Sequence, residues 1–201
     1  MFEDLPKRSL IYLMMQSVYL LLVVNSWCLA QEPVQNFEKL PIGQKDGLKL
    51  TAEIHRQHYK ADEEMVISVK FENLTEKTLY ISKHQPGSED SFIKCVFGIK
   101  DIPALVPFRE PRKYTKPQLS LNDFVFIAPR GVLTVNINIR LSDHLFVPGE
   151  YRLAIWHESL WSQKEVPQLN WLWGSEHGVL HSEITLNGTP VPEPPRIVIT
   201  N

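Results

Sequence analysis

Cysteine is nearly absent from this chain of 201 residues, which contains only Cys28 and Cys95. If Cys28 leaves with an export leader, as argued below, the remaining domain has no internal disulfide and must be held by its apolar core. Cys95 lies in the apolar segment 92–97, on the same side of a predicted strand as Ile93 and Phe97. We expect a buried thiol that packs as a small apolar group. The alternatives are a reactive nucleophile or an intermolecular bridge.

Neither sign of charge dominates. The chain has 21 Lys and Arg against 23 Asp and Glu, a formal net charge of −2, with no basic block. This balance argues against a nucleic-acid partner. Beyond the first 30 residues, no apolar run is long enough to cross a membrane. We therefore expect no membrane contact once the leader is removed.

Residues 1–30 are typical of an export signal peptide. Lys7 and Arg8 precede an apolar run over 10–24, and Cys28 and Ala30 place small residues at −3 and −1 of a cleavage site before Gln31. The alternatives are a retained anchor, for which the run is short, and a lipoprotein at Cys28, which has a bulky Trp before it. Cleavage predicts a periplasmic, extracellular or cell-surface protein.

The apolar residues beyond position 47 recur with a period of two, which predicts half-buried strands of an antiparallel sheet. The segments with this alternation are 48–54, 65–71, 133–141, 151–155 and 179–186, with a short strand at 78–81. No segment shows a helical period with caps. Pro-Gly and Pro-Arg-Gly turns before two of the strands favour a sandwich over a parallel α/β sheet. We expect an extended lead-in at 31–47, a β-sandwich at 48–187 and a Pro-rich tail at 188–201, either an edge-pairing strap or a frayed end.

The segment Pro148-Gly149-Glu150-Tyr151-Arg152-Leu153, with Trp173-Gly174 and the last strand at 182–186, resembles immunoglobulin-like modules of exported bacterial proteins. In those modules a Pro-Gly-x-Tyr turn opens the penultimate strand, and its tyrosine is similar to a tyrosine corner. Upstream, the pair of strands separated by Glu63-Glu64 and ending at Phe71-Glu72-Asn73 resembles the second strand of these modules. The resemblance covers roughly residues 45–187. It implies a single antiparallel immunoglobulin-like β-sandwich of about seven to nine strands with long loops. Some relatives are proteinase-inhibitor-like and others are accessory domains of enzymes.

Residues with the chemistry for catalysis or metal binding are present but not in working patterns. His157-Glu158 begins like H-E-x-x-H, but Trp161 stands where the second histidine is needed. His177 and His181 are separated by a flexible Gly178. With no grouping of nucleophile, base and orienting residue, we expect no enzyme activity, no metal and no cofactor.

Two long loops interrupt the strands, and such loops are often functional. The segment 101–117 carries Arg109, Arg112 and Lys113, and the segment 158–173 carries Trp161 and Trp171. Exposed aromatic rings anchor proteins or stack on sugars. The competing interpretation is that the tryptophans pin the loop to the core.

We therefore expect an exported, non-catalytic binding or structural module whose partner is a protein or a glycan. The five residues just named are its candidate contacts. The alternatives are a proteinase-inhibitor-like domain acting through a protruding loop and an accessory carbohydrate-binding domain. The sequons at Asn73 and Asn187 matter only in a source that glycosylates.

Overall fold

The structure, a computed structural model, describes residues 42–84, 92–99, 105–110, 120–159, 161–169, 171–174, 178–191 and 195–201. The leader predicted for 1–30 lies outside the described residues, as does the lead-in up to residue 41. No helix in the described segments is long and apolar enough to span a membrane.

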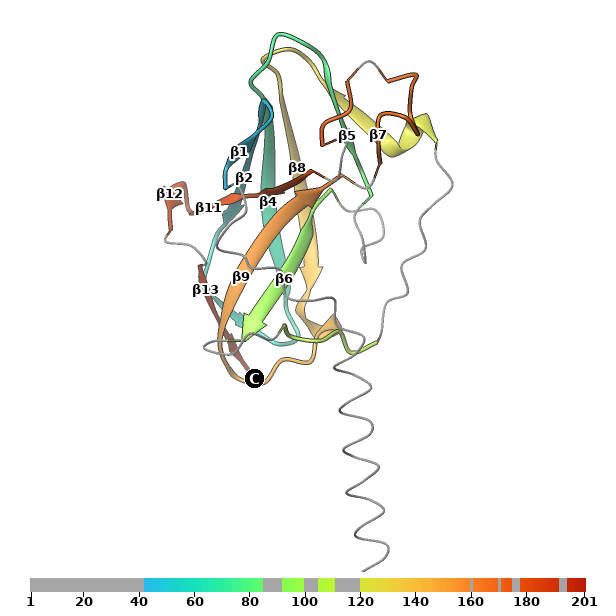
Figure 1. The fold of residues 1–201 in the computed structure, drawn as a ribbon. Coiled ribbons are helices and arrows are strands. Elements are labelled where there is room, and N and C mark those ends of the chain that lie inside the picture. The colour runs from blue at the N-terminus through green and yellow to red at the C-terminus, as the bar shows by residue number, and fades with distance from the viewer. Residues whose placement is uncertain are drawn as a thin grey trace, which may run out of the picture. The chain divides into compact units, whose positions relative to one another are not determined.

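The described segments form β-strands and two single-turn 3₁₀ helices, Leu121–Asp123 and Leu141–Asp143, so the expectation of an all-β protein is confirmed. The first sheet has six strands in the order β12-β11-β2-β4-β8, with β1 paired to β2 (Figure 1). Its strands are β1 (Gln44–Lys45), β2 (Leu48–Ile54), β4 (Glu64–Asn73), β8 (Val132–Arg140), β11 (Glu183–Leu186) and β12 (Thr189–Pro190). All pairings are antiparallel except β11 with β2.

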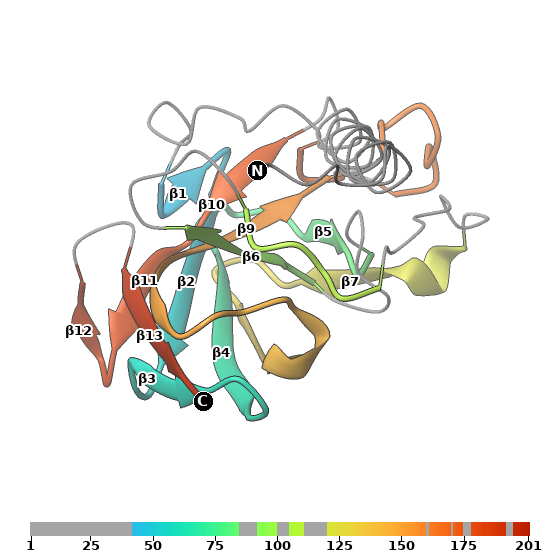
Figure 2. The same ribbon diagram turned by 90° about the horizontal axis from the view of Figure 1, so that it is seen from below.

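The second sheet has five strands, in which the long strand β9 pairs with β6 along one edge and with β10 and β13 along the other. β3 lies beyond β13 and runs parallel to it, as Figure 2 shows. The strands are β3 (His58–Lys60), β6 (Lys94–Ile99), β9 (Gly149–Glu158), β10 (Val179–His181) and β13 (Arg196–Thr200). A third unit is the antiparallel pair of β5 (Leu79–Ser82) and β7 (Phe124–Ile127).

Alternation of apolar and polar residues places one face of each sheet in a common core. The inward residues of β2 and β4 are completely buried: Leu48, Leu50, Ala52, Ile54, Met65, Ile67, Val69 and Phe71. Leu153 and Ile155 of β9 and Phe97 of β6 belong to the same cluster. Burying each large aliphatic side chain contributes about 1.5–3 kcal/mol, so this core supplies the stability that no disulfide provides.

The segment with the clearest alternation forms the edge strand β8, which pairs with β4 from Glu64↔Arg140 to Glu72↔Val132. Val135 and Ile137 face the core but are only half-buried, because no strand in the described part of the chain covers the outer side of β8. The pairing of β8 with β4 continues without interruption along the whole length of β8.

The segment predicted as a single strand at 179–186 is divided between the two sheets, as β10 and β11. The division falls at Ser182, whose backbone N–H and hydroxyl both donate to the Ile155 carbonyl, at 2.9 and 3.1 Å. These two hydrogen bonds to one carbonyl hold the chain at the point where it leaves one sheet for the other. Alternation alone gives no sign of such a change.

The end of the chain belongs to the second sheet. Residues 196–199 pair with 149–152 of β9, and residues 198–200 pair with β3. Ile197 and Ile199 are buried in the core. Of the two alternatives for the tail, a strap ending in a paired strand describes the structure.

Tyr151, at the start of β9, fixes the turn that leads into the strand. Its hydroxyl donates to the Val147 carbonyl and accepts from the Val147 N–H at 3.0 Å. Its ring is 4% exposed and packs edge-on against Phe146, with ring centroids 4.9 Å apart. One side chain thus closes the turn and joins it to the core.

Candidate recognition surface

A second apolar cluster lies apart from the main core, between the β5–β7 pair and the tryptophan-bearing loop. We call residues 161–174 the Trp loop; residue 170 lies outside the described residues. The buried members of this cluster, which we call the loop cluster, are Phe124, Trp161, Val166, Leu169 and Leu172, with Tyr80 packed against them. In Figure 1 the Trp loop is the orange segment beside β5 and β7.

The β5–β7 pair has an apolar face on each side. Leu79, Ile81 and Ile127 belong to the main core. The other face carries the cross-strand pair Tyr80↔Phe126 and, next to it, Phe124. The continuous apolar run Phe124-Val125-Phe126-Ile127 therefore contributes side chains to both the main core and the loop cluster.

Phe126 is the exposed member of this second face. Phe124 is 7% exposed beneath the Trp loop, whereas Phe126, two residues along the same strand face, is 64% exposed. Leu121, in the 3₁₀ helix that leads into β7, is 54% exposed. Exposed apolar side chains mark a recognition surface where they form a contiguous patch.

Side-chain hydrogen bonds fold the Trp loop onto itself. Gln163 donates from its amide to the Val166 and Leu169 carbonyls and accepts from the Leu172 N–H at 3.0 Å. Glu165 accepts from the Ser162 N–H at 2.8 Å. The loop is thus packed around its own residues, as in an Ω-loop.

The two ends of the Trp loop meet at a pair of glycines. The Gly178 N–H donates to the Gly174 carbonyl at 2.9 Å, and the Ser159 N–H donates to the Gly178 carbonyl at 2.8 Å. A Cβ atom on Gly178 would lie 2.4 Å from the Gly174 Cα. Because no larger residue fits, this contact depends on glycine.

The tryptophans of the Trp loop are buried or half-buried, whereas anchors for a partner would face solvent. Trp161 is 4% exposed inside the loop cluster, and Trp173 is 1% exposed in the main core, where its indole donates to the Lys45 carbonyl at 3.1 Å. Trp171 is half-buried, with the Lys77 ammonium 5.0 Å from its ring centre. The packing interpretation therefore describes Trp161, which presents little of its ring to a partner.

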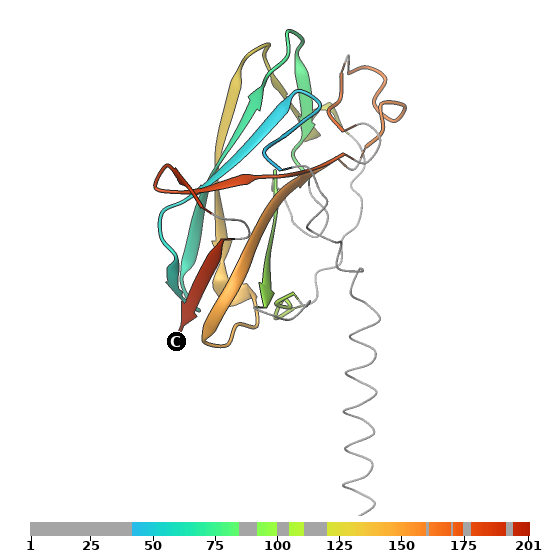
Figure 3. The same ribbon diagram turned by 60° about the vertical axis from the view of Figure 1, so that its left-hand side comes forward.

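Arg109, the described basic residue of the segment 101–117, does not share a surface with the Trp loop. Arg109 is exposed, and its N–H and guanidinium donate to the Asp143 and Ser142 carbonyls at 2.7 and 3.1 Å. Figures 1 and 3 place this segment, in light green, at the opposite end of the described fold from the Trp loop. Arg112 and Lys113 lie outside the described residues.

The turn that presents Leu121 is fixed by polar contacts. The Ser120 hydroxyl accepts from the Asn122 N–H, and the Asp123 carboxylate accepts from the Ser120 N–H at 2.7 Å, which forms a capping box. The His84 imidazole lies 2.9 Å from the other Asp123 oxygen. Burial acts to raise the pKa of Asp123, but the hydrogen bonds from His84 and Ser120 outweigh it and hold that pKa below its usual value. The carboxylate therefore stays ionised at neutral pH.

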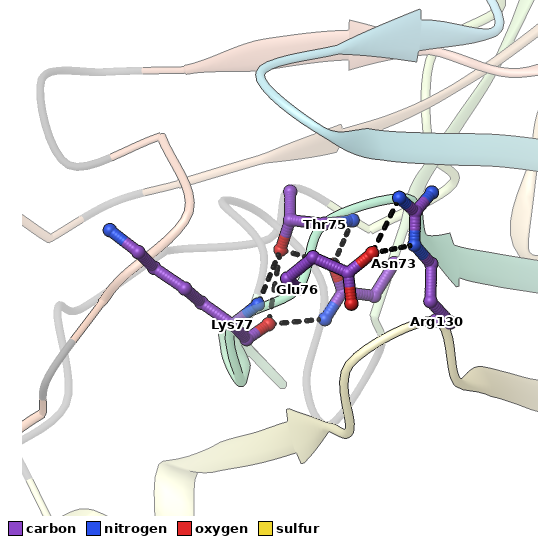
Figure 4. A network of polar contacts seen from close by, with 5 residues as sticks. All are labelled: Asn73, Thr75, Glu76, Lys77 and Arg130. Atoms are coloured by element: carbon purple, nitrogen blue, oxygen red, sulfur yellow. Dashed lines mark hydrogen bonds and ion pairs between the residues drawn. The ribbon is translucent and has the colours of Figure 1, made fainter.

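Asn73 organises the turns at the far end of the first sheet (Figure 4). Its buried amide donates to the Lys77, Ile127 and Ala128 carbonyls at 2.7–3.0 Å, and its oxygen accepts from the Thr75 N–H and hydroxyl. The predicted sequon at Asn73 therefore has its acceptor nitrogen engaged in the folded chain. Asn187, the other sequon asparagine, lies exposed in a turn.

His157 and His181, the two described members of the histidine set considered above, do not converge. His157 is completely buried, its Nδ1 lies 2.7 Å from the Phe92 carbonyl, and burial lowers its pKa to about 4. His181 stacks on the ring of Trp156. Trp156 precedes His157 in β9, so its side chain lies on the opposite face of the strand from that of His157. His177 lies outside the described residues. No group of three potential metal ligands occurs among the residues that the structure describes.

Cys95 packs against the main core, and burial raises the pKa of its thiol to about 12. The thiol is therefore protonated at neutral pH and a poor nucleophile. This agrees with the expectation of a packing role.

Comparison with family models and with curated proteins gives no match. Among solved structures, a β-glucosidase from Erythrobacter marinus aligns at 12% sequence identity with a TM-score of 0.40. The alignment covers 76% of this chain and 15% of the glucosidase chain. A likeness this distant carries no argument about fold or function.

Phe126 and Leu121 are not among the contact residues predicted from the sequence. Phe126 lies in an apolar run without alternation, which predicts burial on both faces. A signal that could have indicated a short peripheral strand is the position of this run directly after a polar turn and before Pro129-Arg130-Gly131.

Proposed function

We propose that this chain is an exported, non-catalytic recognition module built on an immunoglobulin-like β-sandwich, and that it binds a protein partner through the surface around Phe126. The observation that carries the proposal is the 64% exposure of Phe126, whose cross-strand neighbour Tyr80 packs against the loop cluster. Aromatic side chains at such positions dominate the energy of many protein interfaces.

The strand order supports the immunoglobulin-like assignment. β2, β4 and β8 are neighbours in one sheet, in the manner of strands A, B and E, while β6, β9 and β10 match strands C, F and G in the other. The bond of Tyr151 to the backbone four residues upstream is that of a tyrosine corner.

The rigidity of the surroundings supports a preformed surface. The β5–β7 pair is held by the main core on one face and by the Trp loop on the other, and the Trp loop is closed by Gln163 and by the glycine pair. A partner that covers Phe126 would therefore order few additional groups, which lowers the entropic cost of binding.

The proposal is tested with a Phe126→Ser variant and a matched control, Val147→Ser. Val147 is 69% exposed in the turn before β9, so the control removes a similar apolar group elsewhere. The purified proteins are used to capture partners from the extracellular or periplasmic fraction of the source, and the captured partner is identified and titrated.

We expect the wild type and Val147→Ser to bind equally, and Phe126→Ser to bind at least about 30-fold more weakly, the loss for an interface hot spot. Thermal unfolding should be nearly unchanged in both variants. Equal binding by Phe126→Ser would rule out this surface, whatever the partner.

A further inference from the structure

The outer edge of β8 is the longest open strand edge in the described part of the chain. β8 has nine residues and pairs with β4 on one side only. In Figure 1 it is the last strand of the first sheet, on the side away from β11 and β12. An open edge presents backbone donors and acceptors to any chain of matching shape.

Two hydrogen bonds show which backbone groups point outward. The Leu141 N–H donates to the Glu63 carbonyl, and the Asn73 N–H donates to the Gly131 carbonyl. Both bonds join residues that continue the β4–β8 register by one position, one at each end. Because bonded pairs alternate in antiparallel ladders, the odd-numbered residues of β8 point their backbone groups at β4. The even-numbered residues point theirs away: Val132, Thr134, Asn136, Asn138 and Arg140.

The side chains at this edge are incompletely covered. Leu133, Val135, Ile137 and Ile139 pack against the main core, yet each is half-buried. Their cross-strand neighbours on β4 are completely buried. One further strand alongside β8 would cover the same four side chains.

β8 also lacks the features with which edge strands avoid pairing. It contains no proline, glycine or lysine, and its register shows no bulge. Its one charged residue, Arg140, is at the end. Natural edge strands are usually shortened, bulged or charged to prevent association.

We infer that β8 pairs antiparallel with β8 of a second copy of this chain, about a two-fold axis at Asn136. In this register all nine residues are paired. Asn136 faces its own copy, Thr134 faces Asn138, and Val132 faces Arg140. Every outward N–H and C=O group then exchanges bonds with its counterpart, and the two first sheets become one continuous sheet.

The side chains match in the same register. On the core side, Leu133 meets Ile139 and Val135 meets Ile137, so each half-buried aliphatic side chain gains an aliphatic neighbour. On the solvent side, the amides of the two Asn136 residues lie opposite each other. No pair places like charges together. The strand is thus complementary to itself, which a two-fold interface requires.

The test uses charge at the two-fold axis. Asn136 is exposed, so Asn136→Lys and Asn136→Asp leave the core intact, yet each places like charges opposite each other in the homodimer. Ser68→Lys is the control, because Ser68 lies directly opposite Asn136 on β4 but away from the edge. Masses of the full purified protein and the variants are measured by sedimentation over a range of concentrations.

We expect the wild type and Ser68→Lys to sediment at twice the chain mass. Each Asn136 variant should show a dimer dissociation constant raised about tenfold or more. Mixing the two Asn136 variants should restore the dimer, because lysine then faces aspartate. A monomeric wild type, a dimer that neither variant weakens, or a mixture that fails to recover would each overturn the inference; the last two would indicate another surface or another edge partner.

Discussion

Acidification should destabilise this fold through one buried histidine. His157 is completely buried in the main core, packed edge-on against the Phe71 ring with centroids 5.4 Å apart. Its pKa is about 4, mainly because burial disfavours the charged imidazolium. In the unfolded chain the pKa is about 6.5. Unfolding therefore takes up a proton between these two values.

The sign and size follow from this difference. A group whose pKa is lower in the folded state contributes stability that is present above pH 6.5 and is lost as the pH falls toward 4. Each pKa unit corresponds to about 1.4 kcal/mol, so the full loss is about 3 kcal/mol. About 2 kcal/mol of this is lost between pH 7 and pH 5.

The assay is urea unfolding of the wild type and of His157→Gln at pH 7 and pH 5. Glutamine keeps a donor for the Phe92 carbonyl but does not titrate in this range. All other titrating groups, including the buried His181, are common to both proteins. We expect the wild type to lose about 2 kcal/mol more than the variant between the two pH values. An equal loss in both proteins would refute the reasoning.

Two stability predictions test the packing of the loop and the turn network. Trp161→Ala should cost about 3–5 kcal/mol of unfolding free energy in chemical denaturation, because the ring is buried in the loop cluster; Lys164→Ala, on the same loop but exposed, should change it by less than about 0.5 kcal/mol. A small effect of Trp161→Ala would mean that the loop does not pack as described. Asn73→Ala should cost about 2 kcal/mol or more, because three carbonyls lose their donor. Asn138→Ala, at an exposed position on β8, should leave the unfolding free energy nearly unchanged in the same assay. An equal loss of stability in Asn73→Ala and Asn138→Ala would count against the hydrogen-bond network of Asn73.

The elements that sequence could predict are those whose pattern is local. Strict alternation located β2, β4 and β8 because their period of two reflects one core face and one solvent face. The Pro-Gly turn before Tyr151 located the start of β9, because this turn signal also lies within a few residues of the sequence.

What sequence could not predict depends on contacts between distant segments. The change of sheet at Ser182 depends on the Ile155 carbonyl, which belongs to another strand. The burial of Trp161 and the exposure of Phe126 depend on how the Trp loop folds over β7, and composition favours neither outcome. The separation of Arg109 from the Trp loop is likewise a property of the assembled sheets.

The most direct test of recognition through the Phe126 surface is hydrogen–deuterium exchange of the protein with and without its captured partner. We expect slower exchange on binding in residues 121–127 and in the Trp loop, with the turn at Val147 unchanged. Protection confined to other segments, with 121–127 exchanging as in the free protein, would contradict the account.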